Sequence, residues 1–185
     1  MTANIDYTAF TAPRPAPRAP RPAPCALPSN QLPGDLRSWA GCTGLRELVL
    51  TEIAKLDWQN PEVVGYLSRY PAYRPQVLLA VLAYAYAIGE YESDCIAVAC
   101  EQDGDFRALC DGKGGVAAQD LVKFRRANRP LIEEVLKRVF CALRPALCDA
   151  SGVAFSRGII PADDQVCRTE AKRRLDIARH FDTLD

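Results

Sequence analysis

The sequence carries no net charge and has a single histidine. Its 23 Lys and Arg residues balance its 23 Asp and Glu residues, so any affinity for nucleic acid must come from local clusters of basic side chains. The histidine, His180, lies in a charged stretch with no evident nucleophile partner. The patterns G-x-x-x-x-G-K-[ST], G-x-S-x-G and H-E-x-x-H are absent, which removes the sequence support for phosphate-loop, serine-hydrolase and zinc-protease chemistry.

Long apolar runs and strand patterns are also missing. The apolar run that ends at Gly89 is well short of the roughly 20 residues that a bilayer requires, so no membrane-spanning segment is expected. No alternating strand pattern follows Pro145, and the remaining chain is too short for a sheet with covering helices. Enzymes that cut nucleic acid with metal ions hold them with carboxylates on such a sheet. We therefore predict no catalytic activity and no cofactor.

Two other features argue against a metal site. Asp163 and Asp164 are adjacent acids, which more often cap helices or face solvent than bind a metal. The eight cysteines lack C-x-x-C spacing, the arrangement that places two thiolates on one zinc ion. No secretory signal pattern is present, so we expect a reducing cytoplasm, with the cysteines packed as small apolar residues in helices.

The first 35 residues form a tail rich in proline and arginine. The stretch APRPAPRAPRPAP offers too few large apolar side chains to build a core, so residues 1–35 are predicted to be disordered. Arg14, Arg18 and Arg21 could contact phosphates. A plain spacer is the favoured interpretation because no aromatic residue interleaves with them; an SH3-type ligand is a weaker one.

Residues 36–145 have the pattern of a single helical domain. Apolar residues recur at helical spacing over Gly44–Leu56 and over Pro75–Ile88, and a short helix is expected over Asn60–Leu67. Pro75 suits the first turn of a helix, and Gly89 suits the left-handed position after one. The predicted fold class is therefore all-α, a compact multi-helix bundle.

Further helices are expected after Gly89. Ser93, Asp103 and Asp120 are candidate N-caps for three successive helical segments. At Pro130 the third segment is expected to kink, or to stop and restart.

The C-terminal part of the chain is predicted to be a loop followed by a helix. Pro145 is expected to end the helix that follows Pro130, so residues 146–167 are predicted to be a loop. Residues 146–185 thus comprise this loop and a terminal amphipathic helix capped by Thr169. That helix is expected to lie on the core as a solvated element, in preference to a second DNA contact or a partner-binding helix.

The densest basic cluster surrounds Phe124. Lys123, Arg125, Arg126 and Arg129 include no acid among them, which indicates a helix with a basic outer face. Arg125 has two equally supported interpretations, a DNA contact or a structural partner of an acid such as Glu101 or Asp103. Lys123 and Arg126 are expected to be exposed.

A characteristic order of residues runs across these segments: Tyr73, Pro75, Leu78, Leu79, Gly89, Ser93, Asp103, Phe106, Arg107, Leu109, Phe124, Arg125 and Arg126. This order resembles the N-terminal module of InsH-type insertion-sequence transposases. The resemblance implies a helical, DNA-engaging region, with a helix-turn-helix-like segment, placed ahead of a ribonuclease-H-like catalytic domain. Two positions depart from the pattern: Asp94 stands where the family usually has Arg, and Val116–Ala118 stand where it often has Pro-Asp-His.

The leading hypothesis is a transposase-related DNA-binding module that lacks the catalytic domain. Lys123, Arg125, Arg126 and Arg129 would contact phosphates or base edges from a helix in a groove. The alternative is a helical interaction module that binds a second copy or a full-length transposase; the zero net charge and Asp94 favour it. A truncated remnant with a fold but no present role is a third possibility.

Overall fold

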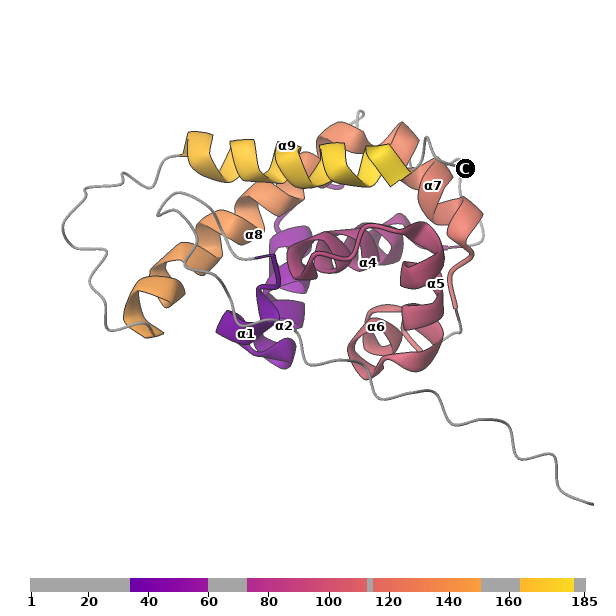
Figure 1. The fold of residues 1–185 in the computed structure, drawn as a ribbon, viewed down its shortest axis with the longest axis horizontal. Coiled ribbons are helices and arrows are strands. Elements are labelled where there is room, and N and C mark those ends of the chain that lie inside the picture. Colours follow the sequence, from indigo (N-terminus) through magenta and orange to yellow (C-terminus); the bar gives the residue numbers. More distant parts are fainter. Residues whose placement is uncertain (1–33, 60–72, 113–114, 151–163, 182–185) are drawn as a thin grey trace, which may run out of the picture.

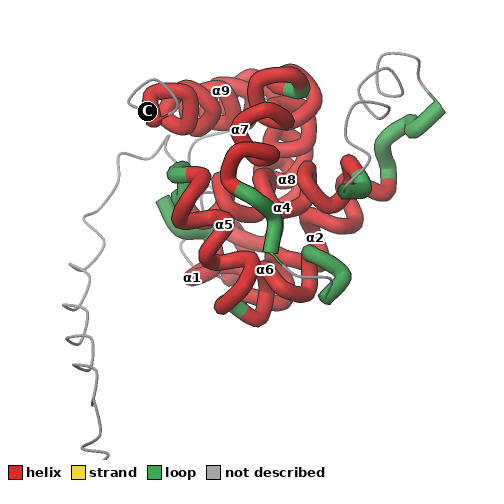
Figure 2. The backbone as a smooth tube through the Cα atoms, turned by 90° about the vertical axis from the view of Figure 1, so that its right-hand side faces the viewer, coloured by secondary structure: helices red, strands yellow, loops and turns green. Residues whose placement is uncertain are grey.

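The computed structural model describes residues 34–59, 73–112, 115–150 and 164–181. Within these ranges the regular structure is entirely helical, which confirms the all-α prediction (Figures 1 and 2). The expected disordered tail and the short helix over Asn60–Leu67 fall largely or wholly outside the described residues. The helices are α1 (Arg37–Ala40), α2 (Cys42–Ala54), α4 (Pro75–Ile88), α5 (Ser93–Gln102), α6 (Gly104–Leu109), α7 (Ala118–Ala127), α8 (Arg129–Ala150) and α9 (Asp164–Phe181).

Helix α4 is the centre of the fold. Every residue from Leu78 to Ile88 is buried, so this helix is apolar on all sides, as expected for a helix enclosed by others. In Figure 1 it lies in the middle of the ribbon, and it contacts α2, α5, α6, α7, α8 and α9. The remaining helices are therefore positioned by the packing of their apolar faces around α4.

Both ends of α4 follow the sequence prediction. Pro75 occupies the first turn, and Gly89 adopts the left-handed conformation with φ 82°. A Cβ atom at Gly89 would lie 2.8 Å from the carbonyl oxygen of Gly34, so a larger residue is excluded by space as well as by conformation. This close approach places the corner between α4 and α5 against the segment that enters α1.

Of the N-caps predicted for α5, α6 and α7, only that of α6 is present. Asp103 caps α6 as predicted, because its carboxylate accepts from the amides of Asp105 and Phe106. The predicted caps of α5 and α7 are wrong: Ser93 and Asp120 each lie inside their helix, and neither helix has a side-chain cap. The hydroxyl of Ser93 instead accepts a hydrogen bond from Arg125.

The chain stops and restarts between α7 and α8. Helix α7 ends at Ala127, Asn128 leaves the helical conformation, and α8 begins at Arg129. Pro130 thus takes a first-turn position, where its missing N–H costs nothing.

The predicted helix end at Pro145 is wrong, because α8 continues to Ala150. The predicted loop over residues 146–167 is wrong at both of its ends, since α9 begins at Asp164. A proline removes one helical hydrogen bond and crowds the preceding turn, which weakens a long helix without always ending it.

Helix α9 lies along α8, and these two helices share the most extensive contact in the described chain (Figure 1). Ala171, Leu175 and Ala178 are buried as predicted. Thr169 is not the cap: it lies within the helix, where its hydroxyl donates to the carbonyl of Gln165. Helix α9 also contacts α4, so its buried face belongs to the core.

Candidate nucleic-acid interface

Helix α7 is oriented by its buried residues. Leu121 and Phe124 are fully buried, which turns Lys123 and Arg126 outward, where both are exposed. These two residues are three positions apart and are therefore neighbours on the helix surface. The structure thus places two of the four predicted DNA-contacting residues where a ligand can reach them.

Arg125, one of the four candidate DNA-contacting residues, is buried. Only 3% of it is exposed, and its guanidinium donates to the hydroxyl of Tyr86 at 2.8 Å, the carbonyl of Tyr91 at 3.1 Å and the hydroxyl of Ser93 at 3.0 Å. Of its two predicted interpretations, the DNA contact is wrong, because Arg125 lies one turn beyond Leu121, on the buried face of α7. Its structural role uses neutral oxygens of α4, α5 and the segment between them.

Burial and the contact with Arg125 both affect the pKa of the Tyr86 hydroxyl. Burial raises the pKa of Tyr86 from 10.0 to about 12, although the charge of Arg125 and its hydrogen bond act in the opposite direction. Burial dominates because the phenolate would lose its hydration inside the core.

We expect the free energy of unfolding to fall as pH rises above 10. Tyr86 in the unfolded chain ionises near pH 10.0, whereas in the folded chain it stays neutral until about pH 12, so the stabilisation is full below pH 10 and is lost through the higher value. Urea unfolding at several pH values, with Tyr86→Phe as the control, measures this loss. An identical alkaline slope in the variant would contradict it.

Arg129 is half-buried and already has an acidic partner. Its guanidinium lies 2.6 Å from the carboxylate of Asp176 on α9. This ion pair joins the start of α8 to α9 beside the end of α7. Its positive charge is partly neutralised, which weakens Arg129 as a candidate for a phosphate contact.

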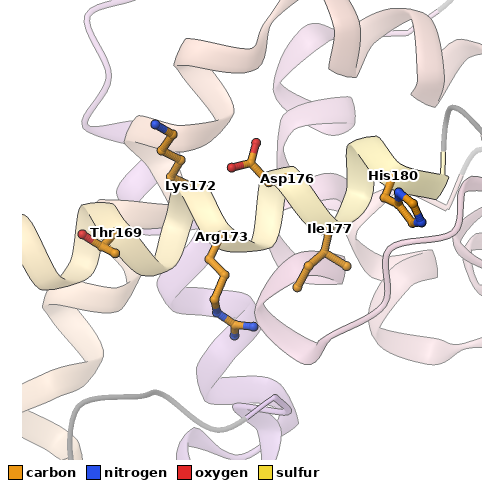
Figure 3. A pocket seen from close by; sticks show the side chains of 6 residues that line it. All are labelled: Thr169, Lys172, Arg173, Asp176, Ile177 and His180. Carbon is orange, nitrogen blue, oxygen red and sulfur yellow. The ribbon is translucent and has the colours of Figure 1, made fainter.

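An open groove of about 550 Å³ runs along α9. Figure 3 shows Lys172 and Asp176 projecting from one side of the helix, and Arg173 and Ile177 from the other. Arg179 is also exposed beyond the groove. The groove is lined by Thr169, Lys172, Arg173, Asp176, Ile177 and His180.

Arg174 is a buried residue that sequence reasoning missed. It is fully buried, and its guanidinium donates to Glu170 at 2.7 Å and to the carbonyls of Tyr86 and Ala87 at 2.6 and 3.0 Å. These two carbonyls lie in the last turn of α4, and each also accepts a backbone amide, from Gly89 and Leu36 respectively. The available signal was the position of Arg174 within the apolar stripe of α9, four residues after Glu170.

Glu170 is held in its charged form by two arginines. Burial raises its pKa, but hydrogen bonds from Arg173 and Arg174 outweigh burial, and the pKa lies below its ordinary value. This contribution to stability is present at neutral pH and is lost as the pH falls through the lowered pKa.

Acidic residues concentrate on a different part of the fold. Between Gly89 and Gly112 the chain has seven acids and one base, Arg107. Asp94, which replaces the arginine expected from the transposase pattern, is among the exposed ones. The second departure lies partly in the core, since Val116 is buried. The charge of the molecule is therefore uneven: α5 and the turns on either side of α5 and α6 are acidic, whereas α7 and α9 carry more bases than acids.

No protein-family model, curated protein or solved structure matches this chain. Among the described residues, no group of three or more His, Cys, Asp or Glu side chains could hold a metal ion. Asp164 instead pairs with Lys137 and Arg168, while Asp163 lies outside the described ranges. No helix in the described part of the chain is long and apolar enough to cross a membrane.

Proposed function

We propose that this chain is a DNA-binding module related to the N-terminal region of insertion-sequence transposases. Lys123 and Arg126 on α7, together with Lys172 and Arg179 on α9, contact the phosphate backbone. The observation that carries the proposal is the ion pair between Arg129 and Asp176. It joins the start of α8, which follows α7 directly after Asn128, to α9. Both α7 and α9 present exposed cations.

The charge distribution supports a local contact rather than a global attraction. The net charge is zero, so a small number of cations on α7 and α9 supplies the binding energy. Phosphate contacts position a protein on DNA without reading its sequence. The proposed interaction is therefore weak at physiological salt and tolerant of sequence.

A salt titration of binding to a mixed-sequence duplex tests the proposal. With four phosphate contacts, the logarithm of the association constant should fall with the logarithm of salt concentration with a slope of about −3 to −4. Replacing Lys123 and Arg126 together by glutamate should weaken binding by about tenfold or more at low salt and reduce the slope by about 2.

The matched control reverses two other exposed charges. Arg74 and Arg107 are exposed and lie outside α7 and α9, so Arg74→Glu with Arg107→Glu changes the net charge equally. This control should bind within about twofold of the unaltered protein. Equal losses in the two double variants, or no binding at low salt, would overturn the proposal.

A second candidate is a helical interaction module that associates with itself. The acidic segment between Gly89 and Gly112 and the bases of α7 and α9 favour it, since the two are complementary in charge. Sedimentation at low salt separates the two functions: concentration-dependent dimers without DNA binding would favour self-association, and a monomer that binds DNA would favour the leading proposal.

A further inference from the structure

The groove along α9 contains a row of three side chains, here called the α9 stripe. Arg173, Ile177 and His180 line the groove at positions i, i+4 and i+7, a spacing that keeps side chains on one face of a helix. Figure 3 shows Arg173 and Ile177 projecting in the same direction. Ile177 is half-buried, whereas Arg173 and His180 are exposed. The α9 stripe thus has an aliphatic centre with a nitrogen-bearing side chain one turn away on each side.

Helix α5 carries a row with the same spacing and acidic ends, here called the α5 stripe. Its centre is Val98, which is 49% exposed. Asp94 precedes Val98 by four residues and Glu101 follows it by three, and both carboxylates are exposed. No residue of α5 is Lys, Arg or His. An aliphatic side chain therefore protrudes from the middle of an acidic helix face.

We propose that the α5 stripe of a second copy of this chain docks in the groove along α9, with Val98 against Ile177. Val98 is exposed within its own chain, so this contact requires a second molecule. The proposal assigns specific surfaces to self-association and needs no DNA. It is compatible with DNA binding, because Lys123 and Arg126 lie on α7 and do not line the groove.

The two stripes match in length. A helix rises about 1.5 Å per residue, so the axial distance from Asp94 to Glu101 and that from Arg173 to His180 are both about 10 Å. With Val98 placed on Ile177, one carboxylate faces the guanidinium and the other faces the imidazole, whether the two helices run parallel or antiparallel. Both of these groups donate hydrogen bonds that a carboxylate accepts.

The charges around the groove favour an acidic occupant. Lys172 and Arg173 are exposed cations, whereas the carboxylate of Asp176 is paired with Arg129. The bonds from Arg173 to Glu170 use its Nε and Nη2 atoms. Its Nη1 atom is therefore able to donate to a carboxylate of the docked α5 stripe.

The contact joins two different surfaces of the same chain. Two copies related by a two-fold axis each place the α5 stripe on the α9 stripe of the other, which makes the contact twice and closes a dimer. Opposite charges across such a contact speed association and make it sensitive to salt.

Sedimentation equilibrium of the full chain without DNA tests the proposal. At low salt the average mass should rise with protein concentration towards that of a dimer, and added salt should weaken the association. Reversing the charges of one stripe, by Asp94→Arg with Glu101→Arg or by Arg173→Glu with His180→Glu, should weaken association by about tenfold or more.

An equimolar mixture of the two charge-reversed proteins is the matched control. In a mixed dimer the reversed α5 stripe faces the reversed α9 stripe, and the two unaltered stripes face each other, so both contacts again join opposite charges. Association should return to within about threefold of that of the unaltered protein, while each variant alone stays weak. A loss caused by altered folding would not be restored by mixing.

Val98→Asn tests the aliphatic centre, with Leu50→Asn as its control. Leu50 is 43% exposed and lies on α2, so both changes remove a similar exposed apolar side chain. Val98→Asn should weaken association by about tenfold, and Leu50→Asn should leave it within about twofold. Circular dichroism verifies that each variant is folded.

Three results would each overturn the proposal. The first is a monomer at every concentration at low salt. The second is a mixture of folded charge-reversed proteins that associates as weakly as either one alone. The third is an equal effect of Val98→Asn and Leu50→Asn, which would show that the α5 stripe is not the docking surface.

Discussion

Replacing Arg174 with methionine is expected to lower the free energy of unfolding by about 3–5 kcal/mol. The substitution leaves the buried carboxylate of Glu170 with one fewer partner and removes the side-chain donor to the carbonyls of Tyr86 and Ala87. It also removes the cation that lies 5.0 Å from the ring centre of Phe140. Because whole domains are stable by only about 5–15 kcal/mol, this loss is a large share of the total.

Urea unfolding monitored by circular dichroism measures the effect. Arg173→Met is the matched control, since Arg173 is the next residue, also bonds to Glu170, and is 44% exposed; it should cost less than about 1 kcal/mol. Adding Glu170→Gln to Arg174→Met should restore part of the loss by removing the buried charge. Equal costs for Arg173→Met and Arg174→Met would contradict the assigned role.

Replacing Arg125 with methionine is expected to lower the free energy of unfolding by about 2–4 kcal/mol. The hydroxyls of Tyr86 and Ser93 and the carbonyl of Tyr91 would each lose a donor inside the core. The expected cost is smaller than at Arg174 because these three acceptors are neutral, whereas Arg174 also bonds to the carboxylate of Glu170.

Arg126→Met is the control for this prediction, since it makes the same chemical change at the adjacent, exposed position. Its effect on stability should stay within about 0.5 kcal/mol. Unfolding curves of the two variants that coincide would show that Arg125 does not hold the corner between α4 and α5.

Arg125 and Arg174 lie on different helices and both bond to Tyr86, near the C-terminal end of α4. Arg125 of α7 bonds the side chain of Tyr86, while Arg174 of α9 bonds its backbone carbonyl. The two guanidinium groups thus fix the C-terminal end of α4 to both helices of the candidate interface. We expect their losses to be non-additive in a double variant, because they share Tyr86.

The sequence predicted the centre of the fold well because α4 has strong signals at each end. Pro75, an apolar run and Gly89 all indicate the same helix, and the structure has it at Pro75–Ile88. Capping was less predictable, since Ser93 and Asp120 can accept amide hydrogen bonds but are not N-caps in the fold. Tertiary contact decided the outcome at Ser93, which bonds to Arg125 instead.

The candidate site was only partly predictable for a related reason. A cluster of four basic residues does not reveal which of them face inward, because arginine can satisfy buried oxygens as well as phosphates. Arg125 and Arg174 both occupy positions on the apolar stripe of their helices, and both are buried. The position of each charged residue relative to the apolar stripe of its helix distinguishes Arg125 and Arg174 from Lys123 and Arg126.

The most direct test of the account compares DNA binding by Arg126→Met and Arg125→Met over a range of salt concentrations, with each affinity corrected for the folded fraction. We expect the salt slope to fall by about 1 in Arg126→Met and to be unchanged in Arg125→Met. A slope that falls in Arg125→Met and is retained in Arg126→Met would contradict it.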